Sequence, residues 1–173
     1  MYAFTSHRAA RAAAGAAAGA AVVLALAPAL VAGCTHYATP SITGVADDPS
    51  VKWGPAPAVL PPGAQFAVLQ GDPSGTGPFV IRLRLPDGYV IPPHTHPTDE
   101  NVTVLDGTFR VGMGRTLAES ALVAVRPGGF VSAPALHAHY AKARGVTTVQ
   151  VNALGPFAIT YVNPADAPRA AAR

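Results

Sequence analysis

The stretch that organises this sequence reads Gly88-Tyr-Val-Ile-Pro-Pro-His94-Thr-His96-Pro-Thr-Asp-Glu100-Asn-Val-Thr-Val-Leu-Asp-Gly107. In an extended backbone His94 and His96 point to one face, and Glu100 keeps the same parity four residues further on. Imidazole nitrogens with a carboxylate oxygen suit iron, manganese, nickel, copper or zinc, whereas calcium and magnesium prefer shells made of oxygen. The stretch therefore predicts a site for one divalent transition metal ion.

The first 33 residues have the composition of an export signal. Residues 1–11 contain His7, Arg8 and Arg11 and no acidic residue, and residues 12–32 contain only Ala, Gly, Val, Leu and Pro. A basic region followed by an apolar one and small residues predicts a signal peptide. A membrane anchor that is never removed is the alternative, since about 20 apolar residues can span a bilayer.

The only cysteine of the chain lies at the end of this segment. Val31-Ala-Gly-Cys34 resembles the bacterial lipobox, which implies that Cys34 is acylated and becomes the first residue of the mature chain. An ordinary secretory cleavage nearby would instead leave a free thiol. We expect an exported lipoprotein at the bacterial cell envelope, facing the periplasm or the cell exterior, with the membrane as a partner through lipidated Cys34.

The remaining 140 residues of the 173 have the length of one domain. We expect a flexible Pro/Ala-rich tether at 34–63, a folded domain at 64–161 and a C-terminal tail at 162–173. Without Arg8 and Arg11 the chain keeps 10 basic and 9 acidic residues, a formal net charge of +1. The basic residues are scattered singly, so we expect no nucleic-acid partner.

Short runs with period two predict an all-β domain after Gly63. Nine strands are expected, with Asp106-Gly107 as a tight turn between two of them and one helical turn at 117–123. The strands are 64–70, 79–85, 89–91, 100–105, 108–113, 130–133, 138–141, 147–153 and 157–161. The expected core residues are Phe79, Val102, Val104, Phe109, Val111, Phe130 and Val149. A closed barrel or sandwich would bury these faces and hide the strand edges.

The histidine-bearing segments resemble the two motifs of the cupin superfamily. Gly88-x5-His94-x-His96-x3-Glu100-x6-Gly107 fits the first motif at every position. Gly128-x5-Pro134-Ala-Leu136-x2-His139 fits the second in spacing, but Leu136 stands where glycine is expected and Ala143 where asparagine is. The resemblance, to a small single-domain bacterial cupin, implies a double-stranded β-helix or jelly-roll barrel.

The resemblance also implies a ligand set. His94, His96, Glu100 and His139 would hold one metal ion inside the barrel and leave open positions for a small molecule. His137 shares the parity of His139 in an extended strand and is the alternative fourth ligand; otherwise it is a candidate proton carrier, as is Tyr140. A metal-free scaffold is the remaining alternative.

Further polar residues are weaker candidates for the pocket. Gln150 and Asn152 share a parity on a late strand, so either could reach the pocket. If Arg82 or Arg84 pointed inward, it would suit a carboxylate substrate, but the simpler expectation is that both arginines lie on a solvated face.

Two functions are compatible with this pattern. The first is a metal-dependent enzyme of the dioxygenase or isomerase type, acting on a small molecule. The second is a lipid-tethered cupin that binds or senses a metal or small ligand without chemistry. One barrel hosts many functions, so the fold does not choose between them. We also expect a homodimer, since cupins frequently dimerise.

Overall fold

The computed structural model describes residues 48–168, which lie within one compact unit that spans residues 41–173. The predicted signal peptide and the predicted lipid anchor at Cys34 lie outside the described residues. None of the described residues belongs to an α-helix, and no helix among them has the length and hydropathy to cross a membrane.

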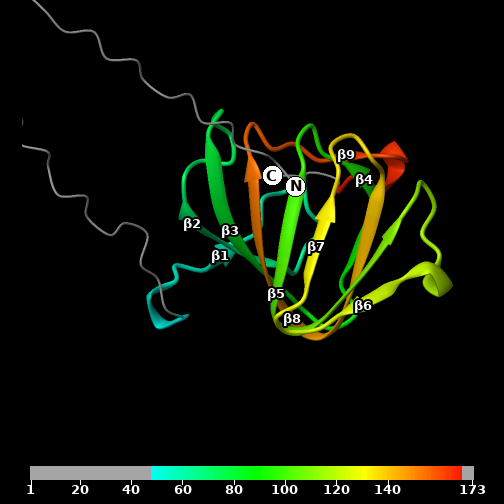
Figure 1. The fold of residues 1–173 in the computed structure, drawn as a ribbon, viewed down its shortest axis with the longest axis horizontal. Helices are drawn as coiled ribbons and strands as arrows, with labels where there is room; N and C mark the ends of the chain where they lie inside the picture. Colours follow the sequence, from blue (N-terminus) through cyan, green and yellow to red (C-terminus); the bar gives the residue numbers. More distant parts are fainter. Residues whose placement is uncertain (1–47, 169–173) are drawn as a thin grey trace, which may run out of the picture. The chain divides into compact units, whose positions relative to one another are not determined.

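The described residues form nine strands that pair antiparallel throughout, in one strongly curled sheet (Figure 1). The strands are β1 (Gly54–Pro55), β2 (Gln65–Gln70), β3 (Pro78–Leu85), β4 (Val90–Thr95), β5 (Glu100–Met113), β6 (Val123–Val125), β7 (Phe130–Ala133), β8 (His139–Leu154) and β9 (Thr160–Tyr161). Three short 3₁₀ helices are η1 (Asp48–Ser50), η2 (Glu119–Ala121) and η3 (Pro164–Asp166). The predicted all-β jelly-roll barrel is confirmed.

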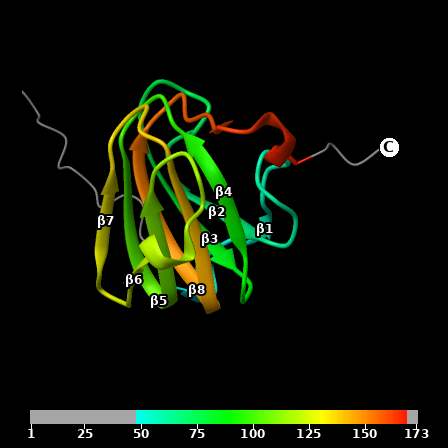
Figure 2. The ribbon, with the colours of Figure 1, turned by 90° about the vertical axis from the view of Figure 1, so that its right-hand side faces the viewer.

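Two long strands hold the curled sheet together. β5 and β8 pair along their whole length, from Glu100 opposite Ala153 to Met113 opposite His139. β8 also pairs with β3 and β4, and β5 with β6 and β7 (Figures 1 and 2). Each long strand therefore takes part in both walls of the barrel.

The predicted turn at Asp106-Gly107 is wrong. The chain does not reverse there, because β5 continues and both of its halves pair with β8. The register shifts on either side of Asp106, and Gly107 has a φ of 76°. An Asp-Gly pair thus makes a bulge that bends a strand, and the segments 138–141 and 147–153 likewise belong to a single strand.

The core lies between the two walls and follows the alternation of the strands. On β3 the even-numbered residues face outward, while Phe79, Ile81, Leu83 and Leu85 are buried. Each fully buried side chain of this size contributes about 1.5–3 kcal/mol to folding. Five predicted core residues are buried: Phe79, Val102, Val104, Phe109 and Val149. Val111 is half-buried and packs against this core.

Phe130 is not a core residue, contrary to prediction, because it is 61% exposed. It pairs with Thr103 on β5, whereas the next residue, Val131, pairs with the buried Val102. The side chain of Phe130 therefore points to the outer side of an edge strand. A run of four residues carries too little alternation to assign its inner face from sequence.

The segment 51–63, which lies inside the range predicted as a tether, packs on the barrel. Val51 and Leu60 are buried, and β1 pairs with β2. The guanidinium of Arg84 lies 4.2 Å from the centre of the Trp53 ring, a cation–π contact on the domain edge. Figure 2 shows this segment on the same side of the barrel as η3.

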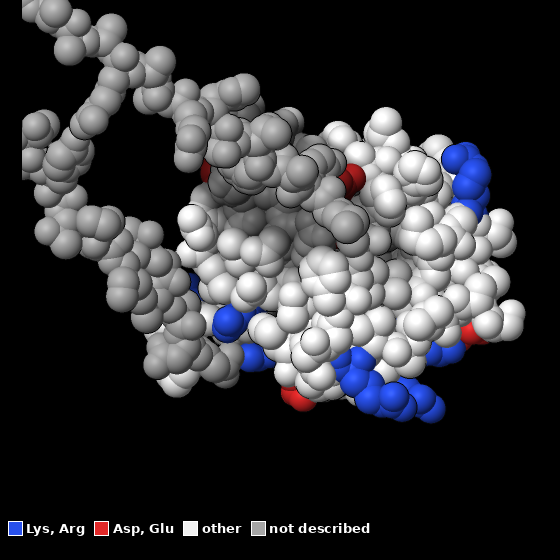
Figure 3. Space-filling view, viewed as in Figure 1, with Lys and Arg blue, Asp and Glu red and all other residues white. Residues whose placement is uncertain are grey.

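Charged side chains are sparse on the surface. Most of the face in Figure 3 is uncharged, and its basic side chains lie along its edges rather than in one stripe. Where opposite charges meet, they tie surface elements together: Glu119 of η2 accepts hydrogen bonds from Arg110 on β5 and Lys142 on β8. These pairs are exposed to solvent, which screens them, so they contribute little to stability.

Candidate metal centre

The predicted ligands lie where three strands meet. His94 is near the end of β4, His96 follows that strand, and Glu100 and His139 are the first residues of β5 and β8. His94 pairs in register with His139 across the β4–β8 ladder, which places their rings 4.4 Å apart. All three histidines are buried. The topology therefore brings together residues that are up to 45 positions apart in sequence.

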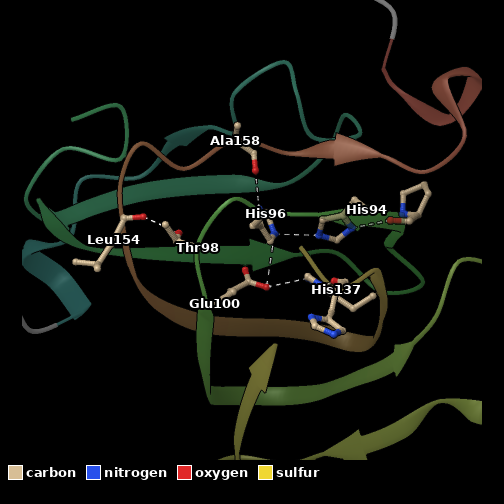
Figure 4. Close-up of polar contacts among 9 residues, drawn as sticks. His94, His96, Thr98, Glu100, His137, Leu154 and Ala158 are labelled. Carbon is tan, nitrogen blue, oxygen red and sulfur yellow. Dashed lines mark hydrogen bonds and ion pairs between the residues drawn. The ribbon is translucent and has the colours of Figure 1, made fainter. Parts of the chain in front are cut away.

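Four donor atoms converge in this cluster (Figure 4). The Nε2 atoms of His94 and His96 are 3.1 Å apart. A carboxylate oxygen of Glu100 lies 3.2 Å from His139 Nε2 and 3.7 Å from His96 Nε2. One ligand atom from each of the four residues lies within 4.8 Å of the others.

Backbone carbonyls fix the orientation of all three imidazoles. The Nδ1 atom of His94 donates to Pro92 O at 2.7 Å, that of His96 to Ala158 O at 2.8 Å, and that of His139 to His137 O at 3.0 Å. Each bond places a proton on Nδ1; for His94 and His96 this leaves the Nε2 lone pair facing the cluster, while His139 Nε2 faces the carboxylate of Glu100. Metal-binding histidines are held in this way, with the second nitrogen bonded to a carbonyl or carboxylate.

The electrostatics of the cluster favour neutral imidazole at His94 and His96 but not at His139. Burial, together with the neighbouring histidines His139 and His96, lowers the pKa of His94 to about 4, and burial lowers the pKa of His96. Burial opposes the charge on Glu100, but the hydrogen bond from His139 and the surrounding histidines outweigh it and lower its pKa. Burial likewise acts against a charged His139, but its bond to Glu100 prevails and raises its pKa. An anionic carboxylate thus faces two imidazoles that are easily kept neutral, those of His94 and His96, and one that holds its proton more firmly, that of His139.

These four residues fit a metal ion. Two Nε2 lone pairs that face each other at 3.1 Å repel unless a cation lies between them. At metal–nitrogen distances of about 2.1 Å, adjacent donors lie about 3.0–3.4 Å apart. The His94–His96 and His139–Glu100 separations of 3.1 Å and 3.2 Å fall in this range, and the His96–Glu100 separation of 3.7 Å lies slightly above it. The cluster could hold a metal through three nitrogens and one oxygen.

A sequence model described as "ChrR Cupin-like domain" matches residues 44–157, most of the chain. The chain belongs to the cupin superfamily. A search of curated proteins found no match to this cupin.

Solved structures share the fold of this cupin at low sequence identity. A protein of Methylibium petroleiphilum assigned as an acetylacetone dioxygenase is 20% identical, with a TM-score of 0.56 over 77% of this chain and 90% of its own. The polyketide cyclase RemF of Streptomyces resistomycificus is 20% identical, with a TM-score of 0.56 over 73% of this chain and 90% of its own. A cupin 2 conserved barrel domain protein of Rhodopseudomonas palustris is 15% identical, with a TM-score of 0.53 over 67% and 80%. At these identities the likeness shows the fold alone.

The departure from the second cupin motif at Leu136 leaves the backbone of the motif intact. Leu136 has a φ of 63°, the left-handed conformation that glycine adopts most easily, and its side chain is 74% exposed. Its N–H donates to His96 O at 2.8 Å, and Asp99 accepts from Ala135 N at 2.7 Å. The turn before His139 is therefore bonded to the loop that carries His96.

The two predicted proton carriers do not lie in the cluster. His137 precedes β8 in this turn, is exposed, and bonds through Nδ1 to Ala135 O. Tyr140 is buried on the other side of β8, where its ring lies against Gly112 and its hydroxyl is 3.4 Å from Ala118 O. Of the two histidines considered for the fourth ligand, the structure brings only His139 to Glu100.

The other polar candidates lie on the outer face of the sheet. Arg82 donates to Gln150 at 3.2 Å, and Gln150 in turn lies 3.5 Å from Asn152. Arg84 bonds to Gln65 and stacks on Trp53. None of these side chains lines the cavities next to the cluster.

A cavity of about 200 Å³ opens from the cluster toward the surface. His94, His96 and Glu100 form its inner end, and its walls are apolar. Part of the wall comes from segments that the sequence did not assign to the site: Val59 and Leu60 before β2, and Phe157 and Ile159 before β9. A second space of about 20 Å³, the size of one water molecule, lies on the core side next to His139.

Phe157 is the residue that could best have indicated from the sequence that these segments belong to the site. It is an aromatic residue next to Ala158, whose carbonyl binds His96. Phe157 stacks on His96 with ring centres 4.1 Å apart, and its neighbour Ala158 accepts the His96 Nδ1 proton. Two tyrosines hold the opposite wall, since Tyr161 donates to Val59 O at 2.8 Å and Tyr89 donates to Pro61 O. Burial raises the pKa of Tyr161 to about 12, so its hydroxyl keeps its proton.

Proposed function

We propose that this cupin binds one divalent transition metal ion, of iron, manganese, nickel, copper or zinc, and is a metal-dependent enzyme of the dioxygenase or isomerase type. The observation that carries the proposal is the convergence of His94, His96, Glu100 and His139, the first three of which also line a cavity. A bound ion with open positions would supply Lewis acidity and, for a redox metal, electron transfer.

The protein's own part is to orient and to exclude water. The carbonyls of Pro92, Ala158 and His137 keep each imidazole in the tautomer that binds metal. Glu100 adds a negative charge that offsets part of the charge of a dication. The apolar walls leave a small molecule few places for its polar atoms except near the ligands, so its reacting end is oriented inward.

Structural relatives support chemistry on small molecules. One is assigned as an acetylacetone dioxygenase and another is a polyketide cyclase. At 20% identity they indicate the kind of reaction that such a barrel accommodates and not the substrate of this one.

The test combines metal content with turnover. Protein purified without a histidine tag, then reconstituted separately with each of the five metals, is expected to hold close to one ion per chain. Oxygen uptake and product formation are then followed on a panel of small acids, phenols, ketones and sugars. His94→Ala should lose both metal and turnover, whereas His137→Ala, an exposed histidine outside the cluster, should keep both. A metal content near zero after reconstitution would refute the proposal.

A second function, binding or sensing without chemistry, is favoured by one observation. Among the described residues, Ser74 is the only polar side chain that lines the cavity apart from the metal-ligand candidates, and neither His137 nor Tyr140 reaches it. The cavity therefore has no separate acid or base to move a proton. Retention of a metal or small ligand through gel filtration, with no turnover by any metal form, would favour this function over the enzyme.

We place the protein at the cell envelope as a lipoprotein, on the sequence of residues 1–34. Mass spectrometry of the mature N-terminus should find acylated Cys34, and Cys34→Ala should move the protein from the membrane to the soluble fraction. An unacylated Cys34 would refute the anchor. We also propose a homodimer, which light scattering of the protein without its signal peptide would test.

A further inference from the structure

The walls of the cavity indicate which kind of small molecule it can bind, which the residues of the metal site alone do not. Ten of the fourteen residues that line it are apolar, and the others are Ser74 and the three ligand residues His94, His96 and Glu100. The apolar side chains come from four separate parts of the chain: the segment before β2, the hairpin of β2 and β3 with its loop, β4, and the segment before β9. The apolar character is therefore a property of the whole cavity and not of one wall.

No lysine or arginine is among the residues of 48–168 that line the cavity. The arginines of β3 are excluded by the alternation of the strand, because Ile81 and Leu83 face the cavity while Arg82 and Arg84 face outward. The remaining charged side chain is Glu100, which is negative. A ligand with a carboxylate or phosphate away from the metal end would find no positive charge and would be repelled by Glu100.

The cavity is also unfavourable for ligands with several hydroxyl groups. A buried hydroxyl needs a hydrogen-bond partner, and the walls around Phe66, Leu83 and Ile159 offer none. The exception is the rim at Ser74, whose hydroxyl is already bonded to Asp72 at 2.7 Å. A sugar would therefore bury several hydroxyls unpaired.

The volume limits the size of the ligand. A dry apolar cavity of about 150 Å³ accepts benzene. The present cavity of about 200 Å³ accordingly accommodates one ring with one or two small substituents. Phe157, whose one face stacks on His96, and Phe66 provide aromatic surface for such a ring.

We propose that the ligand of this cavity is an uncharged molecule of about the size of a single ring, apolar except for one or two oxygen atoms gathered at the end that faces His94, His96 and Glu100. We infer the oxygen atoms from the proposed metal function, and the apolar part of the ligand from the cavity walls alone.

The two ends are tested separately. For the apolar end, benzene is titrated into the metal-free protein, and methyl resonances are followed by NMR. We expect shifts for Ile81 and Leu83, which line the cavity, and not for Leu85, which is buried in the core but does not line it. No shift of Ile81 and Leu83 at saturating benzene would overturn the proposal even if the metal site is real.

For the oxygen end, the protein is loaded with zinc, which is redox-silent, and its dissociation constants for catechol, succinate and glucose are compared by calorimetry. We expect catechol to bind at least tenfold more tightly than either of the others. Equal or tighter binding of succinate or glucose would overturn the proposal. If zinc itself does not bind, the metal function fails while the benzene titration still decides the apolar end.

Two matched substitutions localise the binding. Val59 lines the cavity and Val68 does not, and both are exposed to a similar extent, 42% and 46%. Val59→Trp should weaken benzene and catechol at least tenfold, and Val68→Trp should leave both unchanged. Ile159→Arg, at a half-buried wall position, should lower benzene affinity and raise that of succinate. An equal loss in both tryptophan variants, or no gain for succinate, would count against the cavity as the binding site.

Discussion

Leu136 shows how a residue can depart from a motif while the backbone keeps to it. A leucine in the left-handed region costs about 1–2 kcal/mol, and the 74% exposed side chain recovers little of this by packing. Replacement by glycine removes the strain but adds about 0.5–1 kcal/mol of unfolded-chain entropy. We therefore expect Leu136→Gly to stabilise the protein by about 1 kcal/mol in urea denaturation. Leu136→Ala, which keeps a Cβ, should give no such gain, and a destabilised glycine variant would contradict the argument.

His94 makes the metal-free protein sensitive to acid. Its pKa is about 4 when folded, against an ordinary value of 6.5, so between these values the unfolded chain binds a proton that the folded chain does not. Stability should fall as the pH falls through this window, by about 2 kcal/mol between pH 7 and pH 5 from His94 alone. His96, whose pKa is also lowered, destabilises the folded protein at acidic pH in the same way. His139 has a raised pKa, so it stabilises the folded protein below pH 6.5 and this stabilisation is lost as the pH rises above that value.

Urea denaturation in the presence of a chelator at pH 7 and pH 5 measures this effect. His94→Gln should flatten the pH dependence, and His137→Gln should leave it as in the wild type. An unchanged slope in His94→Gln would show that the burial of His94 is not its cause.

At the residue scale, the first motif could be predicted fully and the second only in part. The spacing of the motif singled out His94, His96 and Glu100, which do lie together, but not through the alternation of one strand, because His96 follows β4 and Glu100 begins β5. The same alternation made His137 equivalent to His139, but β8 begins at His139, and the positive φ of Leu136 lies just before it. The parity of a strand does not extend into the turn that precedes it, and the sequence did not reveal where the turn ends.

Gly107 tests the bend of the long strand β5. A Cβ there would lie 2.3 Å from Val146 O and 2.6 Å from the Thr147 hydroxyl, whereas one on Gly88 would meet nothing within 4 Å. Both glycines have positive φ, at 76° and 73°. Gly88→Ala should cost only the conformational strain, about 1–2 kcal/mol, and Gly107→Ala about 3 kcal/mol or more because the two strands must also move apart. Equal losses in urea denaturation would show that the close approach of β5 and β8 does not matter.

At the scale of elements, the strand sequences were easier to predict than their ends. The alternation of 79–85 and the run 130–133 correspond closely to β3 and β7. The hairpin expected at Asp106-Gly107 failed because the same dipeptide suits a two-residue turn and a bulge. What decides between them is the partner strand, β8, which lies far away in sequence.

At the scale of the molecule, the cavity is closed by segments without periodicity. Residues 57–60 are a proline, an alanine and a valine followed by Leu60, and only Leu60 of these is buried. Their position depends on hydrogen bonds from Tyr89 and Tyr161 to backbone carbonyls, which no local pattern encodes. Residues near the metal ligands were thus predictable from spacing, while the wall that would select the ligand was not.

A metal ion in this cluster would cross-link the barrel, because its ligands come from β4, β5, β8 and the loop after β4. Binding to the folded state alone stabilises it by about 4 kcal/mol when free metal exceeds the dissociation constant about a thousandfold. For a domain of this size we expect the melting temperature of chelator-treated protein to rise by about 10 °C or more on addition of zinc. Scanning calorimetry of His94→Ala and Glu100→Ala should show most of this rise lost, since each removes one of four donors, while His137→Ala should show it in full. If all three variants showed a rise of the same size, the stabilising metal would bind elsewhere, because His94 and Glu100 belong to the cluster and His137 does not.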